Sequence, residues 1–278
     1  MKTITTYSTL GDNGRLGNQM FQYATLLSKA ATWEGRFAIP DSLVQDGKQK
    51  SYELIDSFAN LSAEIVNSER MSEFHRTQLG VYRESDFSFD QNFGLVHPHV
   101  ELFGYFQSEL YFKNHRAQIL KEFQFSEEVK NTVKKSLSII KSSKGADKLC
   151  AVHIRRGDYV NLSNYHTNLG PEYYSPAMQH ILGKLPGKIQ FVVFSDDIEW
   201  CKSFILDREQ VTFSTFSNHL EDLYAISCCN YHIIANSSFS WWGAWLSNTE
   251  CTIAPKAWFG PEGPPNWQSI YPATWLVG

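Results

Sequence analysis

Residues 149–159 read Leu-Cys-Ala-Val-His-Ile-Arg-Arg-Gly-Asp-Tyr. The first half of this stretch is a short apolar run with β-branched character, which predicts a buried strand. The second half changes abruptly to His153, Arg155, Arg156 and Asp158. Guanidinium groups keep their charge and bind phosphate oxygens through paired N–H donors. Because ligands of open α/β sheets bind beyond the carboxyl ends of the strands, the stretch predicts an anion site.

Taken alone, this stretch also fits a surface turn with solvated arginines and a local Arg–Asp bridge. Two other predicted strands favour the site, because polar residues follow them as well. Residues 189–194 lead into Asp196 and Asp197, and residues 231–235 lead into Asn236. The remaining elements alternate with these strands: helices at 176–185, 198–206, 219–228 and 241–246, and short strands at 211–213 and 252–254. This alternation predicts a parallel, doubly wound α/β sheet with its polar strand ends along one edge.

Together the three polar clusters offer the groups that a nucleoside diphosphate needs. Arg155 and Arg156 can neutralise the pyrophosphate. Ser237 and Ser238 can bind phosphate, because a strand gives way to a helix there. A carboxylate of the aspartate pair can accept both the ring N–H and the exocyclic amine of guanine, which favours guanine over uracil or adenine.

Two of these features have alternatives that the sequence leaves open. Asp196 and Asp197 follow a strand and precede a helix, so either of them can be an N-cap instead. The tryptophans at 241, 242 and 245 are expected in the core, although cation–π support of a guanidinium is their alternative.

A second glycine-containing segment lies near the start of the chain. Residues 11–19 read Gly-Asp-Asn-Gly-Arg-Leu-Gly-Asn-Gln, and a helix is predicted over 20–31. A glycine loop that opens a helix directs N–H groups and the positive dipole end at one point, which favours an anion or a polar sugar. The spacing is neither that of a P-loop nor that of the dinucleotide fingerprint. The alternative is a tight strand-to-helix turn with Asn18 as its cap.

Composition narrows the class of protein. The chain has 278 residues, of which 42% are apolar, so it can bury a sizeable core. Its formal net charge of -4 gives no basic footprint for nucleic acid. No signal peptide is visible, and no apolar run approaches the roughly 20 residues of a membrane span. The five cysteines lack metal-ligand spacing, and Cys150 and Cys228 have apolar neighbours in the sequence. We therefore expect buried free thiols in a reducing cytosol and no zinc site.

The chain divides at a small, polar segment, residues 142–147, which follows a helix predicted over 117–143. We therefore expect one domain over residues 1–145 and another over residues 146–278. A strand that runs into a loop is predicted over 100–109. Residues 40–100 show no catalytic spacing.

The motifs in their order resemble those of the bacterial α1,2-fucosyltransferases, a group that shares motifs with α1,6- and protein O-fucosyltransferases. The matching segments are GRLGNQMFQYA (14–24), GYFQSE (104–109), HIRRGDY (153–159), FSDD (194–197) and NSSFSWWGAWL (236–246). HxRRxDY is the most specific of them. The resemblance covers nearly the whole chain and is weakest over residues 40–100, where the acceptor is expected to be recognised.

The resemblance implies a GT-B fold, in which two Rossmann-like domains face a cleft. It implies GDP-L-fucose as the donor, inversion at the anomeric carbon and no divalent metal or other cofactor. The acceptor would be the 2-hydroxyl of a terminal galactose in a lipid-linked or free oligosaccharide, as in O-antigen or glycan biosynthesis. The first domain would face the acceptor, and the second would bind the donor.

The resemblance also implies roles for single residues. The catalytic group would comprise Arg155, Asp158 and Asn18. The donor would be bound by a larger set, in which His153 lies against the nucleoside, an aspartate recognises guanine and the serines hold phosphate: His153, Arg155, Arg156, Asp196, Asp197, Asn236, Ser237, Ser238, Phe239, Gly17 and Asn18. The general base is open among Asp158, Glu109, His153 and transfer without a protein base.

The free thiols and the lack of a visible membrane anchor predict a cytoplasmic enzyme, with at most peripheral contact with a membrane that carries its acceptor. Two other functions stay open at this point. One is fucosyl transfer to another position, such as an α1,6 linkage. The other is a non-catalytic protein that binds a GDP-sugar or a glycan.

Overall fold

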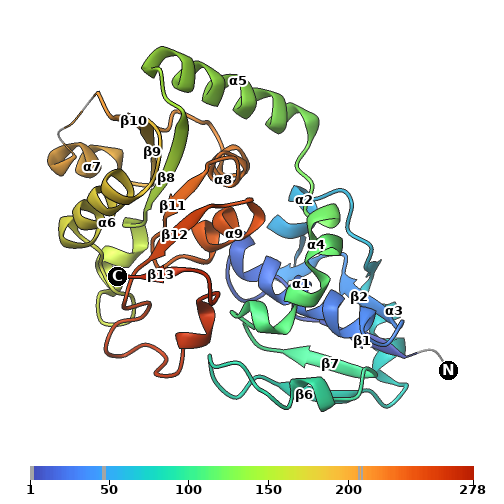
Figure 1. The fold of residues 1–278 in the computed structure, drawn as a ribbon. Coiled ribbons are helices and arrows are strands. Elements are labelled where there is room, and N and C mark those ends of the chain that lie inside the picture. The colour runs from blue at the N-terminus through green and yellow to red at the C-terminus, as the bar shows by residue number, and fades with distance from the viewer. Residues whose placement is uncertain (1–2, 46–47, 206, 208) are drawn as a thin grey trace. The chain divides into compact units, whose positions relative to one another are not determined.

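The computed structural model describes residues 3–45, 48–205, 207 and 209–278 (Figure 1). They form two compact units, and each is an α/β unit with a parallel sheet. The first unit comprises Met1–Gln124 and Asn266–Pro272, and the second comprises Phe125–Pro265 and Ala273–Gly278.

The second unit has a six-stranded sheet in which all pairs of neighbouring strands are parallel. Its strands are β8 (Lys148–Ile154), β9 (Ile189–Ser195), β10 (Val211–Phe213), β11 (Tyr231–Ile233), β12 (Cys251–Ala254) and β13 (Leu276–Val277). The spatial order is β10-β9-β8-β11-β12-β13. Counted along the chain, this is the 3-2-1-4-5-6 order of a dinucleotide-binding Rossmann sheet. The predicted parallel, doubly wound sheet is confirmed.

Helices cover both faces of this sheet because successive residues of a buried strand point to opposite sides. Cys150, Val152 and Ile154 of β8 share one hydrophobic cluster with residues of two helices, α6 (Pro171–Lys184) and α7 (Ile198–Phe204). Leu149 and Ala151 face the other cluster, with α5 (Glu127–Lys144) and α8 (His219–Ser227). Figure 1 shows these two helix pairs on opposite sides of the strands.

Helix α9 (Ser238–Leu246) packs directly against α8. A Cβ at Gly243 would lie 2.4 Å from Ile226 of α8, so only glycine allows this approach. Trp241, Trp242 and Trp245 are buried, which confirms that they belong to the core.

Two predicted helices differ from the observed ones. The helix predicted from residue 176 begins earlier, because Pro171 takes the first helical position and Pro176 lies inside α6. The single helix predicted over 117–143 is two helices, α4 (Arg116–Glu122) and α5. Ser126 caps α5 by accepting a hydrogen bond from the Val129 N–H, which starts a new helix there.

The observed boundary between the units lies before α5, whereas the predicted boundary lies after it. The division lies between Gln124 and Phe125, twenty-one residues before the predicted 145/146 boundary. Val133 and Leu137 of α5 are buried against Leu149 and other residues of the second sheet, so the helix belongs to that unit.

The first unit is built on a five-stranded parallel sheet of order β5-β2-β1-β7-β6. Its strands are β1 (Ile4–Thr6), β2 (Arg36–Pro40), β5 (Glu64–Val66), β6 (Gly80–Arg83) and β7 (Val100–Phe103), with an antiparallel pair β3 (Leu43–Gln45) and β4 (Lys48–Lys50). Its other α-helices are α1 (Leu16–Ala31), α2 (Glu53–Ser57) and α3 (Ser68–His75). Short 3-10 turns complete the chain: Phe93–Leu95, Glu109–Tyr111, Lys113–His115, Gly157–Leu162 and Gln268–Ile270.

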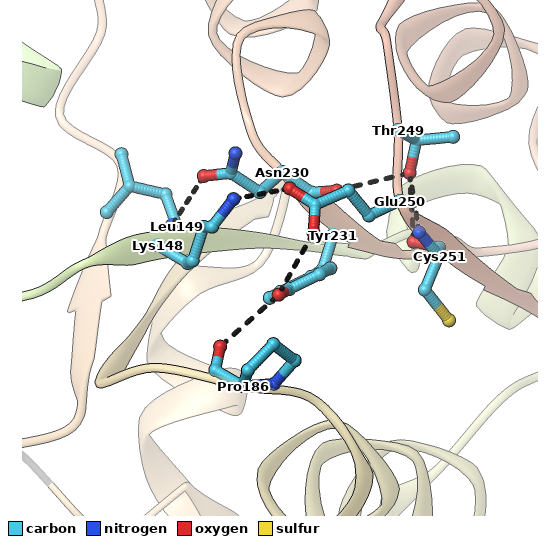
Figure 2. A network of polar contacts seen from close by, with 8 residues as sticks. All are labelled: Lys148, Leu149, Pro186, Asn230, Tyr231, Thr249, Glu250 and Cys251. Carbon is cyan, nitrogen blue, oxygen red and sulfur yellow. Dashed lines mark hydrogen bonds and ion pairs between the residues drawn. The ribbon is translucent and has the colours of Figure 1, made fainter.

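A polar network ties the amino ends of β8, β11 and β12 (Figure 2). Lys148 pairs with Glu250. The Asn230 Oδ1 accepts the Leu149 N–H at 3.2 Å, and the Asn230 carbonyl accepts the Glu250 N–H at 3.0 Å. The Thr249 hydroxyl also donates to the Asn230 carbonyl, at 3.3 Å. At this end of the sheet, polar groups of the protein therefore pair with one another.

Candidate active site at the carboxyl ends of β8, β9 and β11

The strand order of the second unit marks one place at its carboxyl edge. The chain leaves β8 toward β9 on one side and leaves β11 toward β12 on the other. Loops that depart in opposite directions open a crevice between these two neighbouring strands, where ligands of such sheets bind. His153 to Asp158 follow β8, and Asn236 to Ser240 follow β11. The predicted clusters therefore flank this crevice.

Side-chain contacts join the three clusters. Arg155 forms an ion pair with Asp158 and another, at 2.7 Å, with Asp196 after β9. The Tyr159 hydroxyl donates to the Asn236 carbonyl after β11 at 3.2 Å. The strand ends thus lie together, as predicted, and the local Arg–Asp bridge is also present.

Asp196 holds the turn after β8 by two bonds. Its Oδ2 pairs with Arg155, and its Oδ1 accepts the backbone N–H of Arg156 at 2.9 Å. A Cβ at Gly157 would lie 2.5 Å from the Asp196 Oδ2. Glycine is therefore required at position 157 for the carboxylate to approach the turn.

Arg156 is held from another side. Its Nε donates to the Asp197 Oδ2 at 3.2 Å, and its guanidinium lies 3.9 Å from the centre of the Trp200 ring. The Asp197 Oδ1 accepts the Trp200 N–H at 3.0 Å and caps α7. The N-cap alternative is confirmed for Asp197. The cation–π partner of this arginine is Trp200, which the sequence analysis did not identify.

The two guanidiniums face three carboxylates, those of Asp158, Asp196 and Asp197. Both arginine side chains are about a fifth exposed, at 23% and 22%. Each guanidinium has several N–H donors, and only some of them are used in these pairs. The arrangement fixes two cations at the crevice and leaves donors for an anion.

His153 is buried beside these arginines. Burial, and then the Arg155 charge, lower the pKa of His153 to about 3, so the ring is neutral. Its Nδ1 is buried without a hydrogen-bond partner among the described residues. Its ring centre lies 5.7 Å from that of Phe239. A buried polar atom without a partner is costly, and a ligand at this site would satisfy it.

Helix α9 begins beside this histidine. Ser237 is its N-cap residue, but the Ser237 side chain makes no capping hydrogen bond. Ser238 and Phe239 are the first two residues of the helix. Since the first N–H groups of a helix have no partner within it, this end can bind an anion.

The Asn236 side chain is bonded to two loops of the second unit. It is 2% exposed, and its Nδ2 donates to the carbonyls of Thr167 and Trp258 at 3.0 and 2.8 Å. Its amide donors are thus occupied within the protein.

Gly17 and Asn18 belong to the first unit. Helix α1 begins at Leu16 rather than residue 20, so both residues lie in its first turn and Arg15 is the N-cap. The alternative of Asn18 as the helix cap is therefore wrong. The Leu16 N–H donates to the Glu53 carboxylate at 2.7 Å. A carboxylate of the chain itself thus occupies this helix terminus.

The Asn18 side chain has a different partner. Its Oδ1 accepts a hydrogen bond from the Gln107 Nε2 at 2.9 Å. The loop that carries Gln107 is held by Glu84, which accepts the N–H groups of Tyr105 and Phe106. Burial raises the pKa of Glu84 to about 7. Glu84 lies in the region with no motif, so no sequence signal pointed to it.

The predicted base is not identified by these contacts. Asp158 pairs with Arg155, and the neutral His153 has a pKa too low for an effective base. Glu109 lies in a 3-10 turn of the first unit.

Three further expectations concern the whole chain. All five cysteines are free, as predicted, and Cys150, Cys201 and Cys229 are buried. The expected burial is wrong for Cys228, which is exposed because it lies at the C-cap of α8. Within the described ranges, no group of three His, Cys, Asp or Glu side chains is arranged to hold a metal ion. None of the described helices is both long and apolar enough to span a bilayer.

The model of the family described as glycosyl transferase family 11 matches residues 1–277. The chain belongs to this family. An alpha-1,2-colitosyltransferase of Escherichia coli is 31% identical to this family 11 member over 90% of the chain and 91% of that protein. Galactoside 2-alpha-L-fucosyltransferase Sec1 of Mus musculus is 28% identical over 86% of the chain, and the match spans 64% of that protein.

A solved structure supports the fold of this family 11 chain. The fucosyltransferase NodZ from Bradyrhizobium matches with a TM-score of 0.53 and 12% sequence identity. The match covers 89% of this chain and 94% of NodZ. With the two parallel α/β sheets, it confirms the predicted GT-B type of fold.

Proposed function

We propose that this family 11 glycosyltransferase moves L-fucose from GDP-L-fucose to the 2-hydroxyl of a terminal galactose, with inversion. One observation carries the proposal: a Rossmann-ordered sheet places Arg155, Arg156 and the start of α9 at one crevice. Such a crevice suits a nucleoside diphosphate. The α-1,2 linkage in the names of the colitosyltransferase and other matched family members supports the position of transfer and disfavours an α1,6 linkage.

The donor would lie across the β8–β11 crevice of the second unit. Arg155 and Arg156 would bind the diphosphate, together with the N–H groups of Ser238 and Phe239. His153 would lie against the nucleoside, where its unpartnered Nδ1 can form a hydrogen bond. Guanine recognition is assigned to Asp196 or Asp197. Their oxygens already accept protein donors, so guanine would share them.

Leaving-group stabilisation would supply most of the catalysis. Glycosyl transfer passes through an oxocarbenium-like state, so charge develops on the departing GDP before the acceptor bond is complete. Arginines that are fixed by Asp158, Asp196 and Asp197 need little reorganisation at that moment. Two permanent cations can take the place that a divalent metal has in other transferases, and we propose a metal-independent reaction.

The first unit would bind the acceptor. Asn18 in α1, held by Gln107, is its proposed contribution to catalysis. A galactose-terminated oligosaccharide, free or lipid-linked, is the proposed acceptor. A lipid-linked acceptor predicts peripheral membrane contact in the cytoplasm, which co-sedimentation with acceptor-loaded liposomes would test.

A second donor follows from one comparison. The relative that is 31% identical over 90% of the chain is an alpha-1,2-colitosyltransferase. Colitose is fucose without the 3-hydroxyl, so the two donors share the GDP site proposed here.

One assay tests the activity. Purified protein is incubated with GDP-L-fucose or GDP-L-colitose, a panel of β-galactosides and either EDTA or Mg²⁺, and the product linkage is determined by NMR. We expect fucosyl transfer to the galactose 2-hydroxyl at equal rates in EDTA and Mg²⁺. GDP binding without transfer or donor hydrolysis would instead show a non-catalytic binding protein. Activity lost in EDTA and restored by Mg²⁺ would overturn the metal-independent mechanism.

A further inference from the structure

The Asn236 side chain closes a contact between two loops of the second unit. His166 and Phe259 form an antiparallel bridge between the loop after β8 and the loop after β12. The Asn236 Nδ2 donates to the carbonyl of Thr167, next to His166, and to the carbonyl of Trp258, next to Phe259. Neither carbonyl can donate, so the carboxamide must present its nitrogen to both.

The loop after β8 carries this contact back to the arginines. The Tyr159 ring stacks on the His166 ring at a centre distance of 3.9 Å and an interplanar angle of 3°. The Arg155 guanidinium lies 5.4 Å from the centre of the Tyr159 ring. The Tyr159 hydroxyl donates to the Asn236 backbone carbonyl. Asn236 therefore holds both ends of the segment that lies beside Arg155.

We infer that Asn236 is a positioning residue that acts on the donor site through this loop, and not a residue that contacts the donor. Its amide hydrogens are occupied by two carbonyls, and it is 2% exposed. Its Oδ1 is buried without a partner among the described residues, and the double-mutant cycle described below tests whether that atom contacts the donor. The two hydrogen bonds of Asn236 hold His166 in place, and the Tyr159 ring stacks on His166. The Tyr159 ring in turn makes a cation–π contact with the Arg155 guanidinium. The inference rests on the proposed GDP site, because the affinity for GDP is used to measure whether Arg155 is correctly positioned.

The experiment measures GDP affinity by calorimetry and cleavage of the 157–170 loop by chymotrypsin. Asn236→Ala removes both bonds to the loops. We expect GDP to bind about tenfold more weakly, which corresponds to about 1.4 kcal/mol. We also expect faster cleavage after the loop aromatics, because the loop has lost its tie. His166→Ala removes the stacked ring and is expected to weaken GDP binding by a similar factor. His166→Phe keeps an aromatic ring and is expected to retain most of the wild-type affinity for GDP.

A double-mutant cycle separates the two roles of Asn236. If Asn236 acts through the loop, Asn236→Ala combined with His166→Ala binds GDP about as weakly as the weaker single variant. If Asn236 contacts the donor directly, the two losses multiply, and the inference is overturned. Should Asn236→Ala fail to fold, the His166 variants with the conservative Asn236→Ser variant complete the same cycle.

Asn230 provides the matched control, because it precedes the same strand β11 that Asn236 follows. Asn230→Ala removes the bond to the Leu149 N–H and should lower the melting temperature. It should leave GDP affinity and loop cleavage unchanged. An Asn236 variant that behaves like Asn230→Ala has a structural role only, which would refute the inference. Wild-type protein that does not bind GDP would instead refute the proposed function.

Discussion

The two ends of the second sheet differ in how completely their polar groups are paired. At the amino end, His232 is buried, its Nε2 donates to the Ile226 carbonyl at 2.8 Å, and its Nδ1 lies 3.0 Å from the Thr249 hydroxyl. At the carboxyl end, His153 is equally buried, but its Nδ1 has no partner among the described residues. Both rings are neutral, since burial lowers their pKa values to about 4 and about 3.

The charged groups show the same difference. Lys148 at the amino end pairs with Glu250, and the neighbouring polar groups bond to one another (Figure 2). At the carboxyl end, Arg155 bridges two aspartates, and Ser237 makes no side-chain capping bond at the start of α9. A closed network stabilises the fold, whereas preorganised donors without a full set of partners can bind a ligand. The comparison predicts that mutations at one end affect stability and at the other affect function.

The largest expected effect is at the arginine. Arg155→Ala should lower kcat/KM for fucosyl transfer by about 10³-fold or more, since it removes a cation from the leaving diphosphate. Lys148→Ala, the matched cation at the amino end, should lower the melting temperature slightly and leave turnover intact. Transfer assays with thermal unfolding by circular dichroism measure both. Near-normal turnover in Arg155→Ala would contradict both the functional role of the carboxyl end and the proposed mechanism.

The two buried histidines should respond in opposite ways. His232→Phe removes two side-chain hydrogen bonds, and the Cys229 N–H, at 3.1 Å, then remains as a donor to the Ile226 carbonyl. We expect this variant to cost about 1–3 kcal/mol of unfolding free energy. His153→Phe removes no protein hydrogen bond of Nδ1 and should leave stability nearly unchanged, while GDP affinity falls about tenfold. Urea unfolding and calorimetry give the two quantities. Equal stability losses would show that the ends do not differ.

Acid should destabilise the fold through the same rings. Their folded-state pKa values lie below the ordinary 6.5, so the unfolded chain takes up these protons first. The stability from neutral His153 is complete above about pH 6.5 and is lost progressively as the pH falls toward 3. Urea unfolding between pH 7.5 and 4.5 should show a shallower loss for His153→Phe than for wild type. A steeper loss in the variant would contradict the assignment.

The smallest expected effects concern two serine N-caps. Ser126 caps α5 with its side chain, so Ser126→Ala should cost about 1 kcal/mol and leave transfer unchanged. Ser237 makes no such bond at α9. Ser237→Ala should therefore leave the melting temperature unchanged within experimental error and weaken GDP binding a few-fold. A stability loss in Ser237→Ala equal to that in Ser126→Ala would show an ordinary cap.

Much of the site was visible in the sequence because it depends on local order. The switch from Ile154 to Arg155 marks a strand end without any partner being known. The parallel sheet followed from the alternation of elements, and the GT-B fold from the motifs. Two helices differ from their predicted bounds. Ser126 caps α5 and so starts a new helix, and α1 starts at Leu16, before the predicted residue.

The sequence by itself determined which residues end the strands and what chemistry they can offer. Only the tertiary structure decided how those residues are used. Arg155 and Asp196 are 41 positions apart, and Asn236 lies 69 residues from Thr167, whose carbonyl it binds. Such pairings depend on the order of strands in the sheet, which neighbouring residues do not encode. The same carboxamide, predicted from its motif to bind the donor, is therefore turned inward to hold two loops.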